Sequence, residues 1–86
     1  MLIKKSGRIS NSEEDKEIFI QIAINIESLK IKKNLDNTEI AKKMGVTKQA
    51  VSSTLKRLKR GEGIEIPTIR KFAVAMEEKI SYFFDK

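Results

Sequence analysis

Residues 37–51 read NTEIAKKMGVTKQAV, a pattern typical of two short helices that cross at a tight turn. Gly45 can take the positive φ that such a turn requires, and Ala41 is small enough to let the two helices touch. We expect Val46 and Val51 to fill the angle between them. Because the second helix also opens on polar residues, this stretch predicts a helix-turn-helix.

A long helix is expected before this motif. Ser12 is suited to cap its start, and the acidic residues at 13–15 suit the positive end of the helix dipole. Apolar residues then recur with helical spacing as far as Ile31. The residues expected to face the core are Ile18, Phe19, Ile22, Ala23, Ile26 and Leu29.

The same helix carries a second apolar stripe, nearly opposite the first, formed by Ile20, Ile24 and Ile31. One small domain cannot easily bury both stripes. Either the N-terminal arm or the C-terminal aromatic residues cover the second stripe, or it is an interface between two copies. We expect a homodimer through this stripe or through the aromatic residues, which are Tyr82, Phe83 and Phe84.

Further helices are expected after the first. Asp36 is suited to begin the second helix and Thr47 to cap the third. The glycines within 61–63 end the third helix, and Pro67 fits the first position of a fourth. The residues of these helices expected in the core are Ile40, Ala41, Met44, Val51, Leu55, Leu58, Ile69, Phe72, Ala73, Met76 and Ile80.

The pattern as a whole predicts an all-α fold, a compact bundle of about five helices with a long first helix. A chain of 86 residues suffices for one hydrophobic core. We expect a short N-terminal arm at 1–11 and a single helix-turn-helix domain at 12–86. No stretch is apolar enough for a membrane span or a signal peptide, so we expect a cytoplasmic protein.

Cysteine and histidine are both absent, which removes disulfides, thiol nucleophiles, the common zinc sites and the usual general base. No carboxylates or lysines are paired in a recognisable catalytic arrangement. We therefore expect no enzyme activity, no metal site, no cofactor and no small-molecule ligand.

The positive charge of the chain is concentrated in one segment. Seven of the 18 basic residues and none of the 12 acidic residues lie within 40–61. A positive stripe confined to one segment is the electrostatic pattern of a surface that binds a polyanion. This pattern favours a nucleic acid as the partner.

The chain resembles the Cro/repressor-type helix-turn-helix proteins, the XRE family, over about residues 18–84. Besides the motif itself, LDNTEIA at 35–41 is similar to the family's entry to its second helix. PTIRKFAVAM at 67–76 is similar to its fourth helix, and ISYFF at 80–84 to its closing helix. The resemblance implies a bundle of five helices whose third helix enters the major groove of double-stranded DNA, while the second and fourth contact phosphates.

Carried over from the family, the base-reading positions fall on Lys48, Gln49 and Ser53, with Ala50 placed to contact a thymine methyl group. Gln can pair with adenine through two hydrogen bonds, and Lys can donate to guanine. The family's phosphate contacts fall on Asn37 and on the segment from Gly63 to Arg70. The full set of expected phosphate-binding residues is Asn37, Thr38, Thr47, Lys56, Arg57, Arg60 and Arg70.

The chain departs from the family pattern in three places. Thr54 and Leu55 reverse the usual order of an apolar and a polar residue, which predicts a longer third helix and raises a winged-helix alternative. A wing needs two strands, and 63–66 leaves little room for them. Glu77 and Glu78 replace the usual glycine and apolar residue, and the family's minimal domain lacks the arm and the long first helix.

Two hypotheses for the function follow. The first is a repressor-like transcription regulator that binds a palindromic operator as a homodimer. The second is a protein-interaction module, an inhibitor or adaptor, that keeps the helix-turn-helix fold. Acidic residues on the third helix would favour the second hypothesis, and the helix has none before Glu62.

Overall fold

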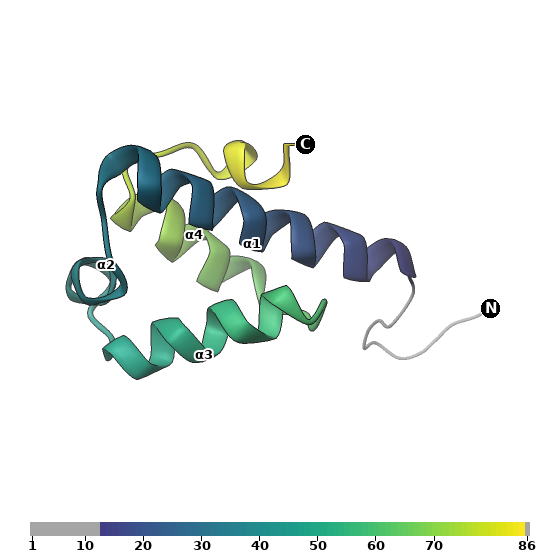
Figure 1. Ribbon diagram of the computed structural model, residues 1–86, viewed down its shortest axis with the longest axis horizontal. Coiled ribbons are helices and arrows are strands. Elements are labelled where there is room, and N and C mark those ends of the chain that lie inside the picture. The colour runs from purple at the N-terminus through teal and green to yellow at the C-terminus, as the bar shows by residue number, and fades with distance from the viewer. Residues whose placement is uncertain (1–12, 86) are drawn as a thin grey trace.

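Four α-helices and one short 3₁₀ helix make up residues 13–85, the part of the chain that the computed structural model describes (Figure 1). The all-α prediction is confirmed, but the closing segment expected as a fifth helix is only a short 3₁₀ helix. No strand occurs in this part, so the wing of a winged helix is absent from 63–66. The expected arm and Ser12 lie outside it. The elements are α1 (Glu13–Lys33), α2 (Asn37–Met44), α3 (Lys48–Lys59), α4 (Ile66–Ala75) and η1 (Ile80–Phe84).

The long helix α1 packs against α3 on one side and against η1 on the other (Figure 1). α2 packs against both α3 and α4, and α4 also contacts η1. All the side chains buried where these elements meet are apolar, so hydrophobic burial is the main force that holds the bundle together. The core residues are Ile22, Ala23, Ile26, Leu29, Ile40, Ala41, Val51, Leu55, Leu58, Ile69, Phe72, Ala73, Met76 and Phe83.

Three apolar residues expected inside lie near the surface instead. Ile18 is 45% exposed because the closing segment ends beside Asn25, two helical turns further along α1. Ile80 is 36% exposed because α4 ends at Ala75, so Ile80 does not continue its inward stripe. Val46 is also exposed, so of the two valines expected between α2 and α3 only Val51 is buried.

The predicted starts of α2 and α3 are confirmed, and that of α4 is shifted by one residue. The Glu39 backbone N–H donates to Asp36 Oδ1 at 2.9 Å, and the Ala50 N–H donates to Thr47 Oγ1 at 3.0 Å. Each side chain thereby satisfies a backbone donor that the first turn of a helix leaves unpaired. α4 begins at Ile66, one residue before Pro67, which therefore occupies the second position rather than the first.

All four α-helices end in the same way, at a residue with a left-handed backbone. These residues are Asn34, Gly45, Gly61 and Glu77, with φ between 56° and 79°. In each case the next residue's N–H donates to the carbonyl five positions earlier, at 2.8 to 3.0 Å. This is the Schellman arrangement, which reverses the chain within a few residues. Glu77 thus takes a left-handed conformation that glycine adopts without a steric penalty.

Polar side chains of α1 tie down the C-terminal part of the chain. Asn25 Nδ2 lies within 2.6 to 3.2 Å of the carbonyl oxygens of Tyr82, Phe83 and Asp85, to which it donates. Gln21 Nε2 donates to Asn25 Oδ1 at 3.0 Å and so orients the amide. These contacts fix η1 on α1 and hold Phe83 in the core.

A second polar contact joins the ends of α1 and α4. The Lys33 ammonium donates to the carbonyl oxygens of Met76 and Glu77 at 2.8 and 2.9 Å. The negative end of the α4 dipole thereby receives a positive charge from another helix.

We expect Asn25→Ala to lower the free energy of unfolding by about 1 to 2 kcal/mol, because three carbonyl groups lose their shared donor. Urea denaturation measures the change. Ser28→Ala, at an exposed position one turn along the same helix, is the control and should change stability by less than about 0.5 kcal/mol. Equal effects of the two substitutions would contradict the anchoring role of Asn25.

We expect Glu77→Gly to raise the free energy of unfolding by about 0.5 to 1 kcal/mol, because glycine takes a positive φ without a steric penalty. The exposed ion pair that is lost, Lys43 with Glu77 at 3.8 Å, contributes little. Glu78→Gly, at the next position, should instead destabilise, because φ is not positive there. Thermal unfolding of the two variants gives opposite shifts in Tm if this interpretation holds.

Candidate nucleic-acid interface

The helix-turn-helix is formed by α2 and α3, which cross at Gly45. Ala41 and Val51 are buried where the two helices meet. Leu55 and Leu58 continue the buried stripe of α3, so the opposite side of α3 faces away from the bundle. The third helix expected from the sequence is therefore present, and the side opposite its buried stripe is exposed.

That open side carries a straight line of polar side chains. Gln49, Ser53, Lys56 and Arg60 recur at spacings of four, three and four residues, which places them on one face of a helix. All four are exposed. The other two expected base-reading residues are exposed as well, and they flank this line on either side; they are Lys48 and Ala50.

The start of α2 lies next to α3 through a side-chain hydrogen bond. Asn37 Nδ2 donates to Ser52 Oγ at 3.1 Å, and Asn37 Oδ1 is buried without a partner in the described residues. This expected phosphate contact therefore also clamps α2 to α3. Thr38 beside it is exposed. The Thr47 hydroxyl accepts from Ala50 and still has its own proton to donate.

Two of the three arginines expected to bind phosphates, Arg57 and Arg60, are paired within the protein. Arg60 Nε lies 2.8 Å from one carboxylate oxygen of Glu62, and Arg57 Nε lies 3.6 Å from the other. The hydrogen bond from Arg60 lowers the pKa of Glu62, and the charges of Arg60 and Arg57 add to this effect. Lys56 directly precedes Arg57 on α3. It forms no ion pair within residues 13–85.

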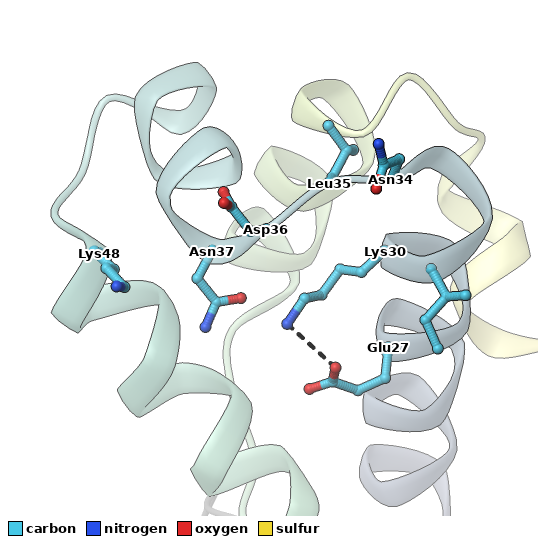
Figure 2. Close-up of a pocket in the computed structure, with 8 residues that line it drawn as sticks. Glu27, Lys30, Asn34, Leu35, Asp36, Asn37 and Lys48 are labelled. Carbon is cyan, nitrogen blue, oxygen red and sulfur yellow. Dashed lines mark ion pairs between the residues drawn. The ribbon is translucent and has the colours of Figure 1, made fainter.

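An open groove of about 560 Å³ lies between α1 and the starts of α2 and α3. Figure 2 shows Lys30 and Glu27 on its α1 side, facing Asn37 and Lys48. Glu27 pairs with Lys30 at 3.2 Å and with Lys59 of α3 at 3.1 Å. Burial raises the pKa of Glu27, but hydrogen bonds from Lys59 and Lys30 outweigh this, so its pKa is lowered. The carboxylate therefore stays ionised and bridges α1 to α3 behind the exposed line.

The expected phosphate contact on α4 is exposed too. Arg70 lies on the outer side of α4 with Ile66 and Val74, which share that side at helical spacing and are also exposed. No ion pair of Arg70 is present in residues 13–85, so its guanidinium group is open to an anion.

A comparison with protein-family models, with curated proteins and with solved structures found no match for this chain. A function for this chain is therefore inferred from its residues and their geometry.

Within residues 13–85, no group of acidic side chains is placed to hold a metal ion. None of the helices there is long and apolar enough to cross a membrane.

The second apolar stripe of α1 lies open in the structure. Ile24 is 51% exposed and Ile31 is 83% exposed, and Ile20 is also exposed, at 37%. The C-terminal aromatics do not cover them: Phe83 is in the core, while Tyr82 is half-buried against the same core. Of the three aromatic residues expected at a dimer interface, only Phe84 is exposed.

Two polar contacts of the site were missed by sequence reasoning. The Asn37–Ser52 hydrogen bond depends on the crossing of two helices, which no local pattern reveals. Glu62 was visible only as the first acid after a basic run, and its spacing of two and five residues from Arg60 and Arg57 was the available indication.

Proposed function

We propose that this protein is a cytoplasmic transcription regulator that binds specific DNA sequences. In the bound state α3 lies in the major groove of double-stranded DNA. The observation that carries the proposal is the exposed line of Gln49, Ser53 and Lys56 on a helix that the rest of the bundle holds from behind. A major groove admits one α-helix, and polar side chains on its outer face can reach base edges.

The chemistry of the exposed side chains supports DNA over a protein partner. Gln49 can read adenine and Lys48 can read guanine, and α3 contains no acidic residue that would repel phosphates. Lys56 and Arg70 supply cations for the DNA backbone, and Asn37, Thr38 and Thr47 supply neutral donors. Base readers and phosphate binders thus occur together, as a sequence-specific protein requires.

The proposal includes a homodimer that binds a palindromic operator. Ile20, Ile24 and Ile31 form an exposed apolar stripe on α1, and burying it against a second copy would remove apolar surface from water. A two-fold axis in the protein matches a two-fold axis in the DNA, which doubles the number of bases read.

Selection of bound sequences from random duplex DNA tests the proposal. Enrichment of one sequence shows specific binding, and a palindrome shows that two copies bind. If no sequence is enriched and binding to duplex DNA is absent at low salt, the proposal fails and the protein-interaction module is favoured.

We expect Gln49→Ala and Arg70→Ala to weaken DNA binding in different ways. Gln49→Ala should cost about 1 to 3 kcal/mol on the best operator and relax the preference at one base pair, because a bidentate base contact is lost. Arg70→Ala should weaken binding to all sequences alike and make the salt dependence shallower by about one unit, because one phosphate is no longer bound. Fluorescence anisotropy at several salt concentrations separates the two. A uniform loss for Gln49→Ala would mean that α3 does not read bases.

We expect Ile24→Glu to give a folded monomer with weaker operator binding, because it places an unpaired charge at a buried contact. Ser81→Glu is the control, since it puts the same charge on an exposed position of η1, on the side of α1 opposite α3. Sedimentation and circular dichroism measure mass and folding. If the parent protein is a monomer at tens of micromolar, the dimer through α1 is wrong.

A further inference from the structure

The segment after α3 places one carboxylate between two arginines. Each oxygen of Glu62 faces a different guanidinium group, Arg60 at 2.8 Å and Arg57 at 3.6 Å. Arg57 Nη2 also donates to the Gly63 carbonyl oxygen at 3.2 Å. The three side chains remain about half exposed, so the cluster is open to a large partner.

The backbone that carries Glu62 is held in place by α1. A Cβ at Gly61 would lie 3.0 Å from Lys16 Cβ, and one at Gly63 would lie 3.1 Å from the ring of Phe19. Both glycines therefore touch the N-terminal half of α1. Because the loop is packed on both sides of Glu62, the pairs can separate by rotation of the Glu62, Arg57 and Arg60 side chains without movement of the loop.

The two guanidinium groups of Arg57 and Arg60 are arranged like an anion-binding site in which the Glu62 carboxylate takes the place of the anion. Arginine binds carboxylate and phosphate with the same planar donor groups, and two guanidinium groups on two oxygens of one anion suit a phosphodiester. Arg60 lies on the exposed line of α3 with Gln49 and Lys56, so a duplex held there reaches this end of the helix.

We propose that Arg57 and Arg60 form a binding site for a DNA backbone phosphate and that Glu62 occupies this site in the free protein. The inference rests on the proposed function and adds an internal competitor to it. Phosphate contacts bind all sequences alike, so a competitor that weakens them lowers nonspecific binding and raises the relative preference for the operator. Exposed ion pairs are weak, so Glu62 attenuates binding without preventing it.

The substitution Glu62→Gln removes the competitor and keeps the side-chain shape. We expect it to tighten binding to a random-sequence duplex about two- to fivefold at low salt, in line with the small free energy of an exposed pair. The salt dependence should steepen by about one unit for each additional phosphate that the arginines bind. Glu14→Gln is the control, because it makes the same change of net charge at an exposed position of α1, outside the expected phosphate contacts, where no ion pair is present in the described residues. The tighter binding should disappear when Arg57→Ala and Arg60→Ala are added.

Equal binding by the Glu62→Gln and Glu14→Gln variants would overturn the inference, and weaker binding by Glu62→Gln would show that Glu62 positions the arginines for DNA instead. If the parent protein and both variants fail to bind duplex DNA, the proposed function fails by itself. The site is then tested with inorganic phosphate, by following the arginine Nε–H resonances in NMR spectra. A response of Arg57 and Arg60 at lower phosphate concentration in the Glu62→Gln variant supports the anion site, and no difference from the parent protein overturns it.

Discussion

Every connection in this bundle has to reverse the chain within a few residues. Each of the four α-helices meets this constraint with one residue in the left-handed conformation at its end. At Gly45 the turn sets the crossing of α2 and α3, and at Gly61 it directs the chain toward α1. At Asn34 and Glu77 a residue with a side chain accepts the same backbone conformation. The apolar stripes depend on these turns for their packing, because each stripe faces the core only if its helix leaves the turn in the right direction.

Local features of the fold could be predicted because their causes are local. Asp36 and Thr47 bond to backbone groups three residues away, and the buried residues of α2 and α3 repeat at helical spacing. Errors arose where tertiary packing decides. Ile18 has the right spacing for the core but lies beyond the end of the closing segment, and Ile80 follows a turn at a glutamate that no composition rule identifies.

The candidate site shows the same division. Exposure of Gln49 and Ser53 could be predicted, since it follows from the buried stripe on the opposite side of α3. The pairing of charges could not. Lys59 pairs with Glu27 of another helix, and the pairing of Arg57 and Arg60 with Glu62 depends on the turn at Gly61. Of the basic residues at 40–61, Lys43, Arg57, Lys59 and Arg60 thus have carboxylate partners in the protein, whereas Lys42, Lys48 and Lys56 form no ion pair within residues 13–85.

The Lys33 contact with the end of α4 closes a loop in the chain, because its partners lie 43 and 44 residues further along. That loop encloses α2, α3 and α4, and therefore the whole helix-turn-helix. The entropic cost of closing a loop rises only with the logarithm of its length, by about 0.6 kcal/mol for each doubling. Insertions or deletions inside the loop therefore have little effect on the free energy of closing it through the Lys33 contact. Because Lys33 donates to backbone carbonyl groups, this contact does not depend on which side chains stand at positions 76 and 77, and it can close the bundle around α2, α3 and α4 whatever residues lie on their exposed sides.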